Sequence, residues 1–183
     1  MNKALMILTL AAITALPGCA KNDDAAIMSA EYAGNSLEQL PVDDNLLGRW
    51  ILPDGQTIEI TSTGKELFSL DTVPASGSPR EGHIVRINGR TFHEIAVGKE
   101  DSRIYSYAAV EIGENSLVRR SINAAWLEAR TRSMPNTTYV QTDEVMKGSG
   151  GVRCESPTQM ATILQIAAVD PAALNPPETL RRP

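Results

Sequence analysis

The chain has 183 residues, 42% of them hydrophobic, which is enough for one domain with a sizeable core. Its 17 basic and 22 acidic residues give a net charge of -5, and no long basic block is present in the sequence. Such a chain lacks the clustered Lys and Arg that attract phosphate backbones, so we expect no nucleic-acid partner.

Residues 1–18 are typical of a signal peptide. Lys3 supplies a short positive region, residues 4–15 form an apolar stretch, and Leu16-Pro17-Gly18-Cys19 follows. The apolar stretch is too short to span a bilayer, which needs about 20 residues. The closing box resembles the processing site of bacterial lipoproteins. The resemblance implies a lipid thioether on Cys19, whereas the alternative is an ordinary secretory signal with a coincidental cysteine.

Residues 19–45 form an acidic segment that we expect to act as a tether between the membrane and the domain. Only Lys21 opposes its acidic residues, and a short helix around residues 25–32 would have little apolar surface to pack. Ala20 stands where an aspartate typically marks retention in the inner membrane of Gram-negative bacteria. The resemblance to lipoproteins therefore implies anchorage in the outer membrane, facing the periplasm.

Residues 46–183 are expected to form one domain that begins with short strands. Runs of strand-forming residues bounded by turn formers lie at 47–52, 57–61, 66–71, 83–88, 91–97, 103–112 and 116–122. Asn88-Gly89 predicts a hairpin with a type I′ turn. Connections of hairpin length favour an antiparallel meander, and a meander that pairs its own edges becomes a barrel.

The strand expected at 103–112 has two different faces. Alternation places Ala108 and Val110 on one face, with Tyr105 and Tyr107 on the other. The tyrosines could line the edge of a groove or cover an outer surface, and we favour the outer surface.

Two helices are expected near residues 124–132 and 157–168. Asn123 is a suitable N-cap for the first, and Ser156-Pro157-Thr158-Gln159 offers the second a capping box with proline at its first position. Between the helices we expect strands at 138–142 and 152–155 and a loop at 148–151. Residues 180–182 add a short closing edge.

Gly48-Arg49-Trp50, in the first expected strand, is similar to the Gly-x-Trp signature of lipocalins, which are up-and-down barrels that hold small apolar ligands. The layout of residues 46–182 resembles that of a group of uncharacterised bacterial lipoproteins with a lipocalin-like barrel. Five segments carry this resemblance, namely residues 47–50, the junction of 116–118 with 123–125, the helix start at 156–159, and two tail segments at 170–174 and 180–182. The expected fold class is mainly β with two short α-helices, an antiparallel meander closing into a small lipocalin-like barrel. The resemblance also implies an arginine packed on Trp50, for which Arg119 and Arg120 are candidates.

No catalytic arrangement emerges, so we expect no enzyme. Ser62-Thr63-Gly64-Lys65 matches the Ser-x-x-Lys pattern of penicillin-recognising enzymes but lies in an expected turn instead of a helix. His83 and His93 flank the Asn88-Gly89 hairpin, yet a zinc site needs about three or four protein ligands. We expect ordinary polar histidines, no metal and no cofactor. Cys154 is expected to be a buried, inert thiol, with a reactive or intermolecular thiol as the alternative.

These expectations leave a non-catalytic binding module for a small apolar or envelope-derived ligand as the favoured function. The alternative is an interaction protein that docks another envelope protein through an outer sheet face. The candidate contact residues are Trp50, Tyr105 and Tyr107, and the lipid on Cys19 supplies the membrane attachment.

Overall fold

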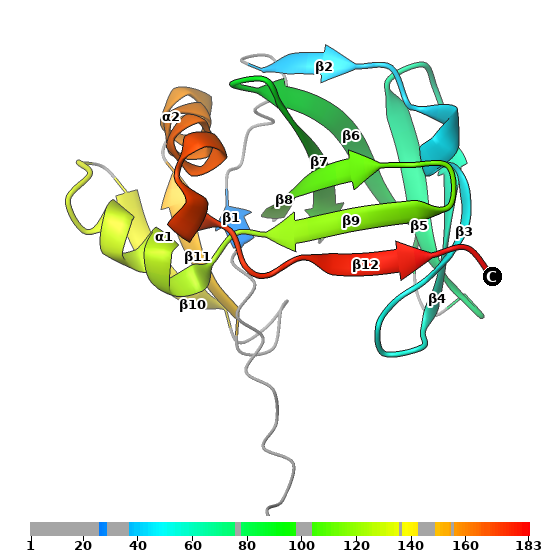
Figure 1. Ribbon diagram of the computed structural model, residues 1–183. Coiled ribbons are helices and arrows are strands. Elements are labelled where there is room, and N and C mark those ends of the chain that lie inside the picture. Colours follow the sequence, from blue (N-terminus) through cyan, green and yellow to red (C-terminus); the bar gives the residue numbers. More distant parts are fainter. Residues whose placement is uncertain are drawn as a thin grey trace, which may run out of the picture.

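The computed structural model describes residues 26–28, 37–75, 78–97, 104–135, 137–142, 149–154 and 156–183. Most of this part of the chain is β-structure, and two helices lie on one side of a barrel (Figure 1). The signal peptide expected at residues 1–18 and the lipidation residue Cys19 lie outside the described residues.

Within the described residues, eight strands form a closed antiparallel barrel. Strands β3 to β9 follow one another as a meander in which each pairs with the next, and β12 closes the ring between β9 and β3. The barrel strands are β3 (Gly48–Ile51), β4 (Thr57–Ser62), β5 (Leu67–Val73), β6 (Arg80–Ile87), β7 (Arg90–Val97), β8 (Ile104–Ile112), β9 (Ser116–Ser121) and β12 (Glu178–Arg181). The expected fold class is confirmed: the barrel has lipocalin-like topology and carries two helices.

The hairpin between β6 and β7 has the turn that its sequence predicts. Asn88 has φ of 49° and Gly89 has φ of 77°, so both central residues occupy the left-handed region that a type I′ turn requires. The Asn88 side chain also donates a hydrogen bond of 2.9 Å to the carbonyl of Gln165, which fixes this turn against a helix.

Three further strands extend the sheet beyond β8, in the order β10 (Thr137–Thr142), β11 (Ser149–Cys154), β1 (Ala26–Met28) and then β8. They form because β9 pairs with only the last part of β8, from Ala108 onward, and so leaves the backbone of the first part open on that side. β1 pairs with this part of β8 at Tyr105, and pairing satisfies edge groups that water or another chain would otherwise take.

Two expectations are corrected by these pairings. The acidic tether expected at 19–45 contributes β1, β2 (Glu38–Leu40) and a 3₁₀ turn at Asp44–Leu46, and residues 26–28 are a strand instead of the start of a helix. β2 pairs with β6 at residues 84–86, beyond the part of β6 that β5 covers. The loop expected at 148–151 is wrong for residues 149–151, which belong to β11 because β10 and β1 supply partners on both of its sides.

Both helices begin where their capping residues predict. The Asn123 side chain accepts a 2.9 Å hydrogen bond from the backbone of Trp126 at the start of α1 (Ala124–Thr131). The Ser156 hydroxyl accepts one of 3.3 Å from Gln159 at the start of α2 (Pro157–Val169). A 3₁₀ turn at Pro171–Ala173 then leads toward β12.

Apolar side chains gather in two clusters, one on each side of the barrel wall. The first cluster, here called the interior core, fills the barrel and comprises Leu46, Trp50, Ile58, Ile60, Phe68, Leu70, Ile84, Ile95, Val110, Leu117 and Leu180. Its packing is tight at Gly82, where a Cβ would lie 2.4 Å from Cζ of Phe68. Glycine at this strand position therefore makes room for the phenyl ring.

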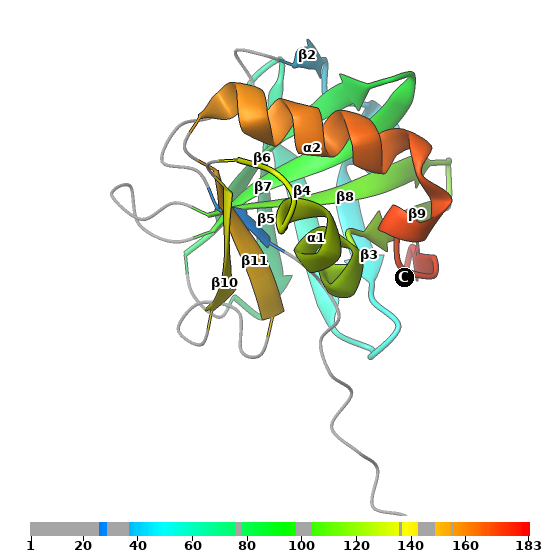
Figure 2. The ribbon, with the colours of Figure 1, turned by 90° about the vertical axis from the view of Figure 1, so that its left-hand side faces the viewer.

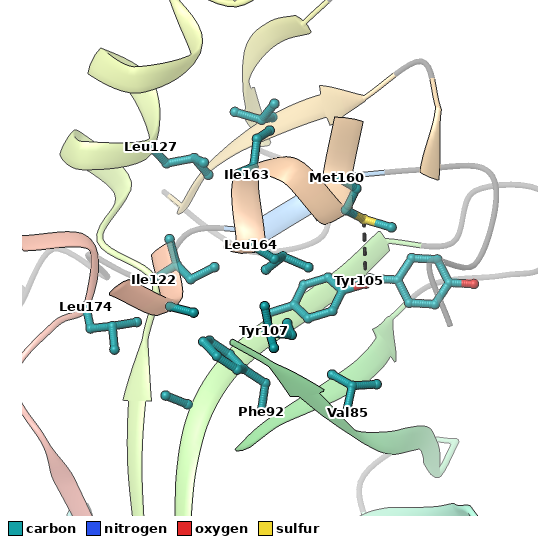
Figure 3. Close-up of a cluster of buried hydrophobic side chains, with 14 of the residues drawn as sticks. Val85, Phe92, Tyr105, Tyr107, Ile122, Leu127, Met160, Ile163, Leu164 and Leu174 are labelled. Carbon is teal, nitrogen blue, oxygen red and sulfur yellow. Dashed lines mark hydrogen bonds between the residues drawn. The ribbon is translucent and has the colours of Figure 1, made fainter. Parts of the chain in front are cut away.

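The second cluster, here called the outer core, lies between the barrel wall and the outer elements. Helix α2 crosses the outside of the barrel wall in front of β6, β7 and β8 (Figure 2). The outer core comprises Val85, Ile87, Phe92, Tyr105, Tyr107, Ala109, Ile122, Leu127, Val152, Cys154, Met160, Ile163, Leu164, Ala168 and Leu174 (Figure 3). The central parts of strands β6, β7 and β8 therefore contribute buried side chains on both faces.

One end of the barrel is held closed by Arg182. Its guanidinium lies 4.5 Å from the centre of the Trp50 ring, and Trp50 donates a 2.8 Å hydrogen bond to the carbonyl of Leu46. Arg182 also donates to the carbonyls of Asn45, Leu47 and Glu114, at 2.9, 2.9 and 3.0 Å. It thereby ties the residues before β3 to the turn between β8 and β9.

The arginine expected on Trp50 is therefore neither Arg119 nor Arg120. Arg119 lies opposite Glu178 on β12, with 3.8 Å between Nη1 and the carboxylate, and Arg120 donates to the carbonyl of Asn175. Arg182 reaches Trp50 past Gly48, where a Cβ would lie 2.8 Å from its Nη1. The φ of Gly48 is also +106°, a conformation that side chains rarely adopt.

We predict that Arg182→Ala lowers the free energy of unfolding by about 2–4 kcal/mol, because it removes three charged hydrogen bonds and the cation–π contact. Urea unfolding followed by tryptophan fluorescence measures this loss. Arg181→Ala is the matched control, since Arg181 is the exposed residue that directly precedes Arg182 at the end of β12, and it should change stability by less than about 0.5 kcal/mol. Equal effects of the two substitutions would contradict the role of Arg182.

Candidate functional site

A cleft of about 700 Å³ lies beside β2, at the end of the barrel that carries the β6–β7 and β8–β9 turns. Its apolar lining comes from Leu40, Ile84, Val110, Ile112 and Ala168. Ile84 and Val110 belong to the interior core, and Leu40 and Ile112 pack against it. Side chains at the edge of the interior core thus form the floor of the cleft.

The rim of the cleft carries charges of both signs. Arg86 and Arg90 line the cleft together with two carboxylates, Asp43 and Glu111. Thr91 lines it at the start of β7. Arg86 also lies 3.5 Å from the carboxylate of Glu38, in an exposed ion pair of small energetic value. An apolar floor with a charged rim suits a small molecule that has an apolar body and a polar end.

The two histidines lie on opposite faces of the barrel wall and do not face one another. His93 is opposite Ile84 of the interior core, so its ring points into the barrel, whereas His83 is opposite Glu94 on the outer face. Burial, then the charges of Arg119 and Arg80, lower the pKa of His93 to about 3, so the ring is neutral at pH 7. Burial is also the main cause that lowers the pKa of His83.

Glu94 is the most unusual polar residue of the outer face. Its side chain is 1% exposed, and neither carboxylate oxygen has a hydrogen-bond partner of good geometry among the described residues. Burial raises its pKa to about 8, an effect that the neighbouring Tyr107 hydroxyl opposes. Glu94 is therefore mostly protonated at neutral pH.

The tyrosines do point outward from the barrel, as alternation predicts, but they do not lie on an open surface. Tyr105 is 5% exposed and Tyr107 is 1% exposed, because the outer elements cover this face. The Tyr107 hydroxyl donates a 3.5 Å hydrogen bond to the sulfur of Met160 on α2 (Figure 3). The expectation that these two tyrosines cover an outer surface is corrected, since the chain's own outer elements bury them.

The remaining candidate residues are structural where they are described. Trp50 is fully buried in the interior core beneath Arg182. Cys154 is a free thiol, 5% exposed, which confirms the expected burial, and burial raises its pKa to about 11. The described residues contain no group of three or more His, Cys, Asp or Glu placed to hold a metal ion. They also contain no helix long and apolar enough to cross a membrane.

Sequence reasoning missed the cleft and the buried carboxyl of Glu94. The cleft forms from β2, two hairpin ends and α2, which are far apart in the sequence, so no local pattern marks it. For Glu94 a signal does exist, because it alternates with Phe92 and Ala96 on one face of β7, and both of those residues belong to or pack against the outer core. A charged residue between two apolar ones on one strand face indicates a buried ionisable group.

We predict that Glu94 makes the protein lose stability as the pH rises. The usual pKa of 4.5 applies to the unfolded chain and about 8 to the folded one, so the folded state binds more protons between these values. The contribution of Glu94 to the free energy of unfolding is largest below pH 4.5. It falls between pH 4.5 and about pH 8 and is constant at higher pH. Glu94→Gln should be more stable than the parent at pH 9 by a few kcal/mol, at most about 5, and should remove most of this slope.

Urea unfolding at pH 5, 7 and 9 gives the three values. Glu111→Gln is the control, because Glu111 is an exposed glutamate on the same face of β8 as Tyr107. The same pH slope in Glu94→Gln and in the parent would show that Glu94 does not titrate as described.

Comparison of the chain with protein-family models, with curated proteins and with solved structures gives no match. The residues themselves therefore supply the basis for a function: a closed eight-strand antiparallel barrel with a cleft that reaches its interior core.

Proposed function

We propose that the protein is a non-catalytic binding module that holds a small, mainly apolar ligand in the cleft beside β2. One observation carries the proposal: Ile84 and Val110 line the cleft and also belong to the core that fills the barrel. A ligand there would extend the interior core outward and remove apolar surface from water, at roughly 25 cal/mol per Å².

The size and charge of the cleft define the ligand further. A volume of about 700 Å³ lies within the range of about 300–1,000 Å³ that is typical of small-molecule sites. Arg86 and Arg90 face a rim that also holds Asp43 and Glu111, so the polar end of the ligand meets both signs of charge. An amphipathic molecule derived from the cell envelope fits this description.

Docking of another envelope protein through Tyr105 and Tyr107 is not proposed, because α2 and its neighbours already cover these side chains. The cleft, in contrast, is open to solvent between elements that are well packed elsewhere. Small-molecule binding is therefore the function that the geometry supports best.

For the cellular setting, we propose that the chain is a lipoprotein of the lipocalin-like group that its sequence resembles. The lipid on Cys19 would hold the barrel at the outer membrane, facing the periplasm. The support for this comes from the Leu16 to Cys19 box and from the barrel topology expected for that group. Two or three acyl chains anchor a protein firmly, whereas one chain holds it only marginally.

We predict that the parent protein binds 11-(dansylamino)undecanoic acid, with a saturable rise in dansyl fluorescence. Thr91→Trp should weaken this binding about tenfold or more, which corresponds to about 1.4 kcal/mol, because an indole at Thr91 fills the cleft. Thr179→Trp is the matched control, since Thr179 is an exposed threonine on barrel strand β12. Absence of binding by the parent, or equal binding by both variants, would contradict the proposed site.

The lipid anchor has its own test. Mass spectrometry of the protein from the membrane fraction should show a chain that starts at Cys19 and carries acyl chains, and Cys19→Ala should move the protein out of that fraction. An unmodified thiol at Cys19 in the membrane-purified protein would rule the anchor out. This result would leave the cleft and its ligand unaffected.

A further inference from the structure

The inner wall of the barrel carries three basic residues that do not themselves line the cleft. Arg80 pairs with Leu70, His93 with Ile84, and Arg119 with Val110, and these three partners belong to the interior core. Residues directly opposite each other on paired strands share a face, so all three basic side chains start from the inner wall. They come from three different strands, β6, β7 and β9.

The three groups are close enough for their charges to act on one another. The charges of Arg119 and Arg80 both act on His93, and the charge of Arg119 acts on Arg80. Arg80 begins β6, and Ile84 and Arg86 of the same strand line the cleft. With about 3.3 Å per residue, Arg80 is about 13 Å along the strand from Ile84, the first residue of β6 that lines the cleft.

The imidazole of His93 has a nitrogen atom without a hydrogen-bond partner in the part of the chain that the structure describes. The residue is 7% exposed, and its Nε2 atom is buried with no hydrogen-bond partner among the described residues. A buried polar atom without a partner costs about 1–3 kcal/mol, so a ligand that supplies one gains this amount in return. The ring cannot attract an anion by charge because it is neutral, but as a neutral tautomer it can donate one N–H.

Carboxylates also lie near the arginines and limit what the cluster attracts. Glu178 pairs with Arg119 at 3.8 Å, and its side chain is 49% exposed, while Asp71 acts on Arg80. An ion pair as long as Arg119–Glu178, with a carboxylate that is about half exposed, contributes little energy. Arginine binds the planar or tetrahedral oxygens of carboxylates and phosphates through charge-assisted hydrogen bonds.

From this arrangement we propose that Arg80, His93 and Arg119 form a second binding site, which takes a small oxyanion, a carboxylate or a phosphate group, inside the barrel. The two guanidinium groups bind the anion's oxygens and His93 Nε2 donates to one of them. Phe68, Leu70 and Ile95 of the interior core fill the barrel near this site, so only the anionic group enters. The site adjoins the cleft, because Ile84 and Val110 line the cleft and pair with His93 and Arg119, but it uses different charged residues, and either site can exist without the other.

The chain contains only two histidines, which makes the test internally controlled. Long-range ¹H–¹⁵N spectra of the full-length protein report on the imidazole nitrogens of both rings. Titration with sodium phosphate or with sodium acetate should shift Nε2 of His93 in a saturable way and leave His83, on the outer face, unchanged. Sodium chloride at the same ionic strength should shift neither ring.

The anion that binds more tightly, phosphate or acetate, identifies the chemical group that the site prefers. Arg80→Gln and Arg119→Gln should each weaken its binding about tenfold or more, because each removes charged hydrogen bonds to it. Arg49→Gln is the matched control, since Arg49 lies on barrel strand β3, pairs with Glu59 at 3.3 Å and is exposed. It should bind the anion as the parent does.

Arg80 lies at the start of its strand and is exposed, so Arg80→Gln keeps the test valid even if Arg119→Gln does not fold. The proposal is overturned if neither anion shifts His93 beyond the chloride control. It is also overturned if Arg80→Gln binds the anion as tightly as Arg49→Gln. Failure of the dansyl probe to bind would refute the cleft alone, because that measurement does not involve His93.

Discussion

The contact between Arg182 and Trp50 ties the two ends of the domain together. Arg182 follows the last strand, Trp50 lies in the first barrel strand, and the same guanidinium binds three carbonyls around them. β12 pairs with β3 through a single register pair, Arg181 with Ile51, so backbone pairing alone joins these strands weakly. The side chain of Arg182 supplies the closure that the ladder lacks, and the interior core depends on that closure.

A closed barrel with a filled interior changes where a ligand can bind. The aliphatic side chains and Phe68 of the interior core occupy the space that a deep cup would need. The cleft therefore lies at the side, where β2 covers the end of β6 without sealing the space between the two hairpin ends. The outer face is also unavailable to a ligand or partner, because residues of α2 pack against Tyr105 and Tyr107 and form the outer core with them.

Two buried ionisable residues, adjacent in β7, lie on opposite faces of the barrel wall. His93 faces inward toward arginines and is held neutral, whereas Glu94 faces outward into the outer core and is held protonated. In each case burial is the largest cause of the pKa shift, because both faces of this strand are covered. Neighbouring residues of one strand thus keep two ionisable groups uncharged near neutral pH, one beside a proposed anion site and one beneath a helix.

The sequence by itself determined the barrel strands, the type I′ turn at Asn88-Gly89 and both helix starts, because alternation, turn residues and caps act over a few residues. It also determined that Tyr105 and Tyr107 share a face. Only the tertiary structure decided what covers that face, which arginine reaches Trp50, and that parts of the acidic segment pair with β6 and β8. The cleft likewise depends on segments more than 100 residues apart in the sequence, because residues such as Leu40 and Ala168 line the same space. Such contacts follow from how the barrel closes and which strand edges remain open, and no local pattern encodes them.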